Sequence, residues 1–387
     1  AGITPHPRQI SWQETEFYGF IHFSPNTFTN REWGEGTEDP QIFDPTNLDT
    51  DQWAAVARSA GMRGLIITAK HHDGFCLWPS KYTEHSVKNS SFAGDVVGLA
   101  AESCRRAGLK FGIYNSPWDR HEPSYGDSPK YNEHFRNQLR ELCSNYGELF
   151  TLWFDGACGE GPNGKRQVYD WNSYYEVIRE LQPNACISIC GPDTRWCGNE
   201  AGVCRNSEWS VVPAELQDQE KIADASQKED DSTFRLKITS TDSDLGSRSK
   251  ISQAAKLVWY PAEVDTSIRP GWFYHQSEDN QVRALEELLN IYYGSVGGNA
   301  TLLLNFPPDR RGLIHENDAA RAKELGDVLR KTFDMNLTEG GTVTVGPGTS
   351  EILHHEADRC IDGTPGTYWT AADGDETAEL LFHLTAP

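Results

Sequence analysis

The stretch Gly64-Leu65-Ile66-Ile67-Thr68-Ala69, followed at once by Lys70-His71-His72-Asp73-Gly74, shows the pattern that decides the fold. A short apolar run predicts a buried β-strand, and the polar residues after it mark the end of that strand. The same arrangement returns at residues 149–154, where Leu-Phe-Thr-Leu-Trp-Phe precedes Asp155 and Gly156. The sequence therefore predicts buried strands whose ends carry titratable side chains.

Strand-like and helix-like segments alternate over most of the chain. The runs that predict strands are residues 17–23, 64–69, 110–114, 149–154, 185–189, 257–260, 271–274 and 300–305. Apolar residues three and four positions apart predict helices at residues 51–60, 96–107, 132–146, 172–181, 281–292 and 317–332. Gly61, Gly108 and Gly147 stand where left-handed helix caps are expected. Eight strands with intervening helices favour an α/β fold of the (β/α)8 barrel type.

Two parts of the chain break this alternation. The polar segment 192–256 is too long for a simple barrel connection, and we expect it to cover the mouth of the active site. After Lys331 the composition changes to Thr, Val, Gly and turn residues, which is typical of β structure. We therefore expect a catalytic (β/α)8-like barrel over residues 1–332 and the start of a β-sandwich domain over residues 333–387.

The composition excludes several classes of partner. The chain has 387 residues, with 57 acidic and 35 basic side chains and a formal charge of −22. Such an excess of negative charge repels nucleic-acid phosphates and anionic membranes. The apolar runs are far shorter than the roughly 20 residues that span a bilayer. The chain begins at Ala1 without Met, and we expect a secreted or periplasmic protein whose signal peptide has been removed.

Polar groups follow four successive predicted strands. His22 lies in the first strand, His71 and His72 follow the second, Tyr114 ends the third and Asp155 follows the fourth. In a parallel barrel the catalytic groups lie at the C-terminal ends of the strands, so these side chains are expected to converge. Because adjacent residues of a regular strand point to opposite faces, His71 and His72 should not both bind one ion, and we expect no metal cofactor.

Asp155 emerges from an apolar and aromatic run, residues 149–154. A carboxylate in such surroundings must be ion-paired, hydrogen-bonded or catalytic, since burying an isolated charge is costly. Capping of the following turn is the structural alternative. The sequence therefore makes Asp155 a candidate catalytic residue.

Four motifs occur in a specific order: Gly19-Phe20-Ile21-His22-Phe23, Arg31-Glu32-Trp33-Gly34, Lys70-His71-His72-Asp73-Gly74-Phe75 and Trp153-Phe154-Asp155-Gly156. This ordered set resembles the α-L-fucosidases of glycoside hydrolase family 29, over roughly residues 10–330. Two further segments, Gly198-Asn199-Glu200-Ala201-Gly202 and Pro261-Ala262-Glu263-Val264-Asp265, are similar to the subgroup that prefers α-1,3 and α-1,4 fucosyl linkages. The C-terminal segment from Arg359 to Asp375 resembles the opening of a galactose-binding-like sandwich.

The resemblance implies a retaining exo-α-L-fucosidase that acts on fucosylated glycans without a cofactor. It implies that Asp155 is the nucleophile and that Glu200 is the acid/base, with Glu208 and Glu263 as alternatives. The residues implied to contact the sugar are His22, Glu32, Trp33, His71, His72, Tyr114 and Trp153. The methyl group of fucose needs an apolar wall, which Trp272 or Phe273 could supply. A retaining barrel glycosidase for another terminal sugar and an inert carbohydrate-binding protein remain as alternatives.

Overall fold

The computed structural model describes residues 2–230, 243–364, 366–375 and 377–385 of the chain. The chain divides into two compact units, Ala1–Asp327 and Val328–Pro387. The first unit contains a large parallel sheet, and the second contains a small antiparallel sheet.

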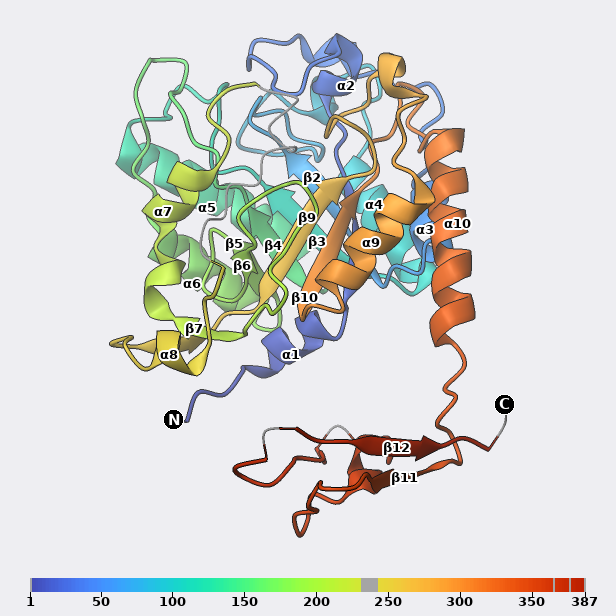
Figure 1. Cartoon of the computed structure of the whole chain (residues 1–387). Helices are drawn as coiled ribbons and strands as arrows, with labels where there is room; N and C mark the ends of the chain where they lie inside the picture. Colours follow the sequence, from blue (N-terminus) through green and yellow to red (C-terminus); the bar gives the residue numbers. More distant parts are fainter. Residues whose placement is uncertain (1, 231–242, 365, 376, 386–387) are drawn as a thin grey trace. The chain divides into compact units, whose positions relative to one another are not determined.

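Eight parallel strands form the centre of the first unit (Figure 1). Their order across the sheet is β5-β4-β3-β2-β1-β10-β9-β6. The strands are β1 (Phe17–Ile21), β2 (Gly64–Lys70), β3 (Lys110–Asn115), β4 (Thr151–Phe154), β5 (Cys186–Ile189), β6 (Arg195–Trp196), β9 (Ala262–Ser267) and β10 (Ala300–Asn305). A parallel bridge joins Ser188 of β5 to Thr194, the residue before β6, and so brings the two edges of the sheet together. The expected (β/α)8-like barrel is confirmed.

The helices that follow the strands agree with the six that the sequence predicts. They are α3 (Thr50–Ser59), α4 (Val96–Ala107), α5 (Ser128–Asn145), α6 (Trp171–Leu181), α9 (Leu285–Ser295) and α10 (Glu316–Phe333). The expected cap residues Gly61, Gly108 and Gly147 have positive φ angles of 88°, 67° and 81°. The sequence did not predict the short helices α1 (Pro7–Gln13), α2 (Pro25–Thr29), α7 (Gln219–Ala225) and α8 (Arg248–Ile251). No described helix separates β5 from β6.

Two of the predicted strands are wrong as barrel strands. Residues 257–260 contain β8 (Leu257–Trp259), which pairs antiparallel with β7 (Val211–Pro213) outside the barrel. Residues 271–274 form a loop, because the backbone N–H groups of Trp272 and Phe273 donate to the carboxylate of Glu32 rather than to a neighbouring strand.

The barrel uses β6 and β9 in place of these two segments. β6 has only two residues and lies inside the polar segment 192–256, so it gives no periodic signal. β9 is buried along its whole length, although Glu263 and Asp265 interrupt its apolar pattern. The sequence therefore predicted the right number of strands while misplacing two of them.

Aromatic side chains fill the barrel interior. One buried cluster contains Trp12, Tyr18, Phe20, Ile66, Tyr114, Trp153, Cys186, Ile189 and Leu303. The rings of Tyr114 and Trp153 stack with their centroids 5.3 Å apart. Dense packing of this kind fixes side-chain rotamers, so the polar ends of these aromatic residues point in defined directions.

The second unit is a small β structure. Its strands β11 (Thr342–Val345) and β12 (Leu380–His383) pair antiparallel. This agrees with the β-type composition that follows Lys331. Among the described residues, no helix is both long enough and apolar enough to cross a membrane.

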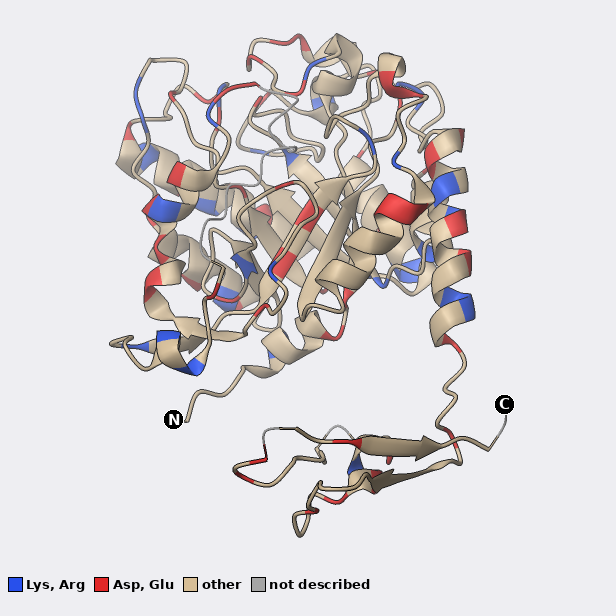
Figure 2. Cartoon of the chain, in the orientation of Figure 1, with Lys and Arg blue, Asp and Glu red and all other residues tan. Residues whose placement is uncertain are grey.

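A buried ion pair joins the loop after β9 to helix α10. The Arg269 Nε lies 3.0 and 2.7 Å from the two carboxylate oxygens of Asp318, and both side chains are fully buried. Helix α10 also carries exposed charges of both signs along its surface (Figure 2). The exposed pair Lys323 and Asp327 on the same helix provides a direct comparison with the buried pair.

Replacing Asp318 by Ala should lower the free energy of unfolding by about 3 to 5 kcal/mol, because the guanidinium of Arg269 loses its main buried partner. Urea or thermal unfolding measures this change. The control Lys323→Ala breaks an exposed pair on the same helix and should cost less than about 1 kcal/mol. Equal effects of the two substitutions would show that the buried pair contributes no more than a surface pair.

Candidate active site

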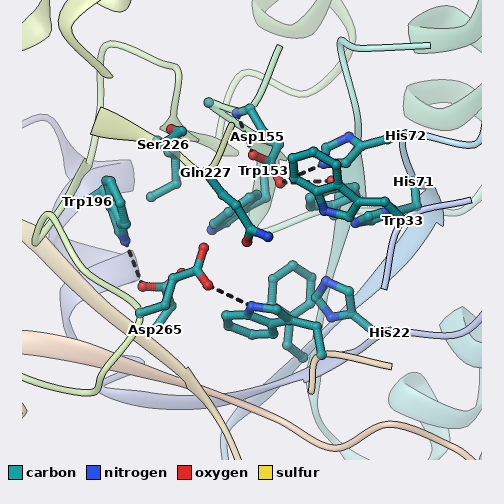
Figure 3. Close-up of a pocket in the computed structure, with 17 residues that line it drawn as sticks. His22, Trp33, His71, His72, Trp153, Asp155, Trp196, Ser226, Gln227 and Asp265 are labelled. Atoms are coloured by element: carbon teal, nitrogen blue, oxygen red, sulfur yellow. Dashed lines mark hydrogen bonds and ion pairs between the residues drawn. The ribbon is translucent and has the colours of Figure 1, made fainter. Parts of the chain in front are cut away.

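A cavity lies at the C-terminal ends of the barrel strands. All of the expected site residues except Glu32 line it, and Figure 3 shows His22, Trp33, His71, His72, Trp153 and Asp155 among them. The described residues that line the cavity are Phe20, His22, Trp33, His71, His72, Tyr114, Trp153, Asp155, Gly156, Ala157, Ile189, Trp196, Glu200, Ser226, Gln227, Asp265 and Trp272.

Asp155 follows β4 directly, and two hydrogen bonds hold its carboxylate. The Tyr114 hydroxyl donates to Oδ2 over 2.9 Å, and the backbone N–H of Ala157 donates to Oδ1 over 2.7 Å. Burial raises the pKa of Asp155, while these donors favour its ionised form. The side chain is still 23 % exposed toward the cavity. Asp155 is therefore an oriented carboxylate that can reach a ligand.

Two of the imidazoles present a lone pair to the cavity. The Asn305 amide nitrogen donates to Ser267 and to the carbonyl of Trp272, so its Oδ1 must accept from His22 Nδ1, 2.9 Å away. In the same way Ser116 donates to the carbonyl of Trp118 and accepts from His72 Nδ1 over 2.7 Å. These partners assign the proton to Nδ1 in both rings, which leaves Nε2 as an acceptor.

All three histidines are neutral at ordinary pH. Burial lowers the pKa of His22 to about 3 and that of His72 to about 3, and it also lowers the pKa of His71 well below its usual value. His71 Nδ1 is buried without a hydrogen-bond partner among the described residues. His72 Nε2 lies 3.8 Å from Asp155 Oδ2, so two acceptors face each other across a gap. A ligand hydroxyl, which can donate and accept, suits both places.

His71, His72 and Asp155 also form the described group whose spacing could hold a metal ion. Their ligand atoms lie within 4.8 Å of one another. The sequence argument about His71 and His72 assumed a strand that stays regular through both residues, and this condition is not met, because β2 ends at Lys70 and the two rings lie in the following loop with centroids 4.1 Å apart. The spacing of these three side chains thus permits a metal ion as well as sugar hydroxyls.

Glu200 and its two alternatives occupy different environments. Glu200 lines the cavity, and its Oε2 accepts a 2.8 Å hydrogen bond from Trp272 Nε1. Glu208 lies outside the cavity lining and pairs with the guanidinium groups of Arg195 and Arg205 at 2.7 and 3.0 Å. Burial would raise the pKa of Glu208, but these two arginines outweigh it and lower the pKa.

Glu263 lies inside the barrel wall below Trp153. Its carboxylate accepts hydrogen bonds from the Tyr18 hydroxyl and from Trp153 Nε1, the latter over 2.7 Å. The residue is fully buried and does not line the cavity. Burial raises the pKa of Glu263 to about 7. Of the three candidate acid/base residues, Glu200 alone is placed to meet a ligand in the described cavity.

Glu32 was expected to contact the sugar, and the structure gives it a different position. Its carboxylate oxygens accept hydrogen bonds from the backbone N–H groups of Trp272 and Phe273 over 2.7 and 3.2 Å, and His275 Nε2 lies 2.6 Å away. Glu32 therefore holds the loop that carries Trp272. Trp272 lines the cavity, whereas Phe273 packs behind His22 with ring centroids 5.3 Å apart.

Several lining residues were missed by the sequence reasoning. Trp196 and Asp265 come from β6 and β9, the two strands that were not predicted, and Ser226 and Gln227 come from the segment 192–256. The alternation of acidic and small or apolar residues along β9 was the available signal for Asp265, since alternation is typical of a strand. Ser226 and Gln227 carried no signal of their own, although the expected role of their segment at the cavity agrees with their position.

Comparisons with known proteins point to one family. The family model described as alpha-L-fucosidase matches residues 5–333. Alpha-L-fucosidase 1 of Arabidopsis thaliana is 42% identical over 337 residues, which cover 86% of this chain and 62% of that protein. This chain therefore spans about three fifths of the length of its plant relative.

Two solved structures resemble the chain closely. A glycoside hydrolase 29 family member from an unknown rumen bacterium is 44% identical, with a TM-score of 0.76 over 90% of this chain and 61% of the other. A Ruminococcus gnavus GH29 fucosidase in complex with fucose is 31% identical, with a TM-score of 0.79 over 98% of this chain and 78% of the other. The chain belongs to the α-L-fucosidase family, glycoside hydrolase family 29.

Proposed function

We propose that the chain is a retaining exo-α-L-fucosidase that releases terminal α-1,3- or α-1,4-linked fucose from glycans. The observation that carries this proposal is the presence of two carboxyl groups, Asp155 and Glu200, in one cavity with three neutral imidazoles. Neutral imidazoles and indole N–H groups hydrogen-bond sugar hydroxyls without adding charge. The fucose complex of the R. gnavus relative supports fucose as the sugar.

Asp155 acts as the nucleophile in the first step. Its carboxylate attacks the anomeric carbon, the bond to the glycosidic oxygen breaks, and Glu200 gives its proton to that oxygen. The hydrogen bonds from Tyr114 and Ala157 orient the attacking carboxylate before the sugar arrives. The product of this step is a fucosyl ester of Asp155 and a free aglycone alcohol.

Glu200 acts as the base in the second step. It removes a proton from water, the water oxygen bonds to the anomeric carbon, and the ester bond to Asp155 breaks. The indole of Trp272 holds Glu200, and Glu32 holds the backbone of Trp272. Two displacements at one carbon return fucose with its original anomeric configuration.

Asp155→Ala should lower the turnover of an aryl α-L-fucoside by several orders of magnitude while leaving the fold and fucose binding largely intact, because the attacking carboxylate is lost while the histidines that are assigned to the sugar hydroxyls stay in place. Initial rates and calorimetric binding of fucose measure the two effects. Azide should restore turnover with inverted product.

Asp170→Asn is the matched control, since this exposed carboxylate caps α6 and does not line the cavity. It should leave the rate close to that of the unmodified chain. An Asp155→Ala variant with ordinary turnover would refute the assignment of Asp155 as the nucleophile. Turnover of an aryl galactoside in preference to the fucoside would favour the other retaining glycosidase, and no turnover of either would favour the inert binding protein.

Glu200→Ala should lose about 10² to 10⁴ in rate on an α-1,3- or α-1,4-fucosylated oligosaccharide, whose leaving group needs a proton. The burst of nitrophenolate from an aryl fucoside should fall much less, because that group departs without help. Comparison of the two substrates measures the difference. Glu215→Ala removes an exposed carboxylate of the same segment and should change neither rate.

The assignment of Glu200 would be contradicted by equal losses on both substrates. In retaining enzymes the two carboxyl groups stand about 5 to 5.5 Å apart. A crystal structure with bound fucose that placed Glu208 or Glu263 at this distance from Asp155, and Glu200 well beyond it, would transfer the role to the nearer residue.

Prolonged dialysis against a chelator should leave the activity unchanged, because the three histidines are assigned to sugar hydroxyls. The measurement is the rate on an aryl fucoside before and after dialysis, with metal content determined in parallel. Loss of activity that zinc restores would instead assign His71, His72 and Asp155 to an ion.

A further inference from the structure

Strand β9 carries two buried acidic side chains, Glu263 and Asp265, two positions apart. Residues at this spacing lie on the same face of a strand. Each of the two carboxyl groups accepts a hydrogen bond from an indole. Trp153 Nε1 donates to Glu263 Oε1 over 2.7 Å, and Trp196 Nε1 donates to Asp265 Oδ1 over 2.8 Å, the latter drawn in Figure 3. Both indoles line the cavity, so the acids of β9 are bonded to its aromatic walls.

The hydrogen bond of Trp153 decides which part of its ring a ligand can meet. An indole has a single N–H, and Glu263 accepts that of Trp153. Glu263 is fully buried and does not line the cavity, so this N–H is already used inside the barrel. Trp153 therefore offers a ligand only the carbon atoms of its ring. Trp196 and Trp272, which also line the cavity, likewise donate their N–H groups to carboxyl groups.

The ring of Trp153 lies beside the proposed nucleophile. Trp153 precedes Asp155 by two positions, and both residues line the cavity. The indole stacks on the ring of Tyr114, with centroids 5.3 Å apart and planes inclined by 25°. The Tyr114 hydroxyl in turn donates to Asp155 over 2.9 Å. The orientation of this indole thus shapes the surface next to the carboxylate that the sugar approaches.

The surroundings of Glu263 are unusual for a carboxyl group. Its side-chain hydrogen-bond partners among the described residues are neutral, namely the Trp153 indole and the Tyr18 hydroxyl, which also lies 3.0 Å from Thr301 Oγ1. Burial of a carboxyl group among neutral donors is unfavourable, and an apolar side chain could fill the same space without that penalty. A need to orient the indole accounts for an acid at this position, because a buried Trp N–H requires an acceptor.

We propose that Glu263 is a positioning residue for sugar binding, whose carboxyl group holds the indole of Trp153 so that its ring supports the C–H surface of a bound fucose. This inference rests on the proposed function, in which the cavity takes a terminal fucose. A pyranose ring has C–H groups as well as hydroxyls, and an aromatic ring packs against C–H groups without a polar partner. The histidines then bind the hydroxyls, while Trp153 contacts the apolar surface of the same sugar.

Glu263→Met tests the proposal, because methionine is unbranched and fills the space but is a poor acceptor for the indole. The Kd of fucose and the KM of an aryl fucoside should each rise about tenfold, as loss of an oriented aromatic contact predicts. The kcat should change less, since the contact is made both before and during the reaction. Calorimetric binding of fucose and initial rates measure these values.

Glu263→Gln should restore the Kd and the KM to within about twofold of the unmodified chain, because its amide oxygen can accept from Trp153. Its amide nitrogen can donate to the Tyr18 hydroxyl, which can donate to Thr301. Rescue by glutamine but not by methionine is the result expected for an acceptor that positions the indole. Equal weakening of fucose binding in the two variants would overturn the proposal.

Glu141→Met is the matched control. Trp78 Nε1 donates to Glu141 Oε2 over 2.9 Å, and neither residue lines the cavity. This substitution removes the same kind of hydrogen bond and should lower the melting temperature while leaving the Kd of fucose unchanged. If it weakened fucose binding as much as Glu263→Met does, general loosening of the fold would explain both results and the proposal would be wrong.

The contact itself can be followed without any substrate. The indole N–H signal of Trp153 in a ¹H–¹⁵N spectrum, identified by its absence in Trp153→Phe, should move upfield in Glu263→Met. Trp153→Phe leaves Glu263 without an indole to hold, so the affinity for fucose should fall, and adding Glu263→Met should weaken it no further. If Glu263→Met does not fold, Trp153→Phe still decides, because ordinary fucose affinity in that variant would overturn the proposal.

The outcomes separate this inference from the proposed function. A shifted indole signal together with weakened fucose binding supports the positioning role. An unchanged signal refutes it, and so does a shifted signal with ordinary fucose affinity, although in both cases the chain can still be a fucosidase. Failure of the proposed function has a different signature, since the unmodified chain itself would neither bind fucose nor hydrolyse a fucoside.

Discussion

The candidate site depends on the hydrogen bonds that the carboxylate of Glu32 accepts. Its oxygens accept the backbone N–H groups of Trp272 and Phe273, so the loop after β9 is held by a side chain from the loop after β1. Burial alone would lower the pKa of His275, but the hydrogen bond and the charge of Glu32 outweigh burial and raise it. Through Trp272 the same carboxylate fixes one oxygen of Glu200. A residue outside the cavity thus determines where the proposed proton donor lies.

Burial shifts the pKa values of the acids and the bases of the cavity in opposite directions, and both shifts favour the neutral form of the group. It lowers the pKa values of the histidines and raises that of Asp155, so both kinds of group are pushed toward their neutral forms. The hydrogen bonds from Tyr114 and Ala157 oppose the effect of burial on Asp155, and they favour the ionised carboxylate that an attacking group needs. Neutral imidazoles beside one ionised carboxylate suit a substrate that has many hydroxyls and no charge.

The sequence allowed the fold and much of the site to be predicted wherever local pattern and burial agree. Strands β1 to β5 and β10 are apolar runs, and their polar ends identified His22, His71, His72 and Asp155. The prediction failed where long-range contacts decide the structure. Residues 271–274 resemble a strand, but Glu32 binds their amides, and this contact spans about 240 positions of the sequence.

The same limit explains the residues that were missed. β6 forms only because β9 lies beside it, and β9 buries two acidic side chains that local rules place at the surface. Asp265 could therefore be recognised as part of the cavity only after the register of these two strands was known. The placement of Glu200, by contrast, came from its resemblance to a family motif rather than from any local pattern.

The short connection between β5 and β6 has a consequence for how this barrel can change in evolution. No helix occurs in the described residues 190–194 between the two strands, and Asp193 within this connection binds Arg8 of α1 at 3.1 Å and the backbone N–H of Ile187 at 2.7 Å. The side of the barrel that carries Asp155 and the side that carries Glu200 are thus joined by a few residues, which these contacts hold in place. Extra residues inserted there would displace one carboxyl group relative to the other. The β5–β6 connection must therefore keep its length if the two carboxyl groups are to keep their spacing.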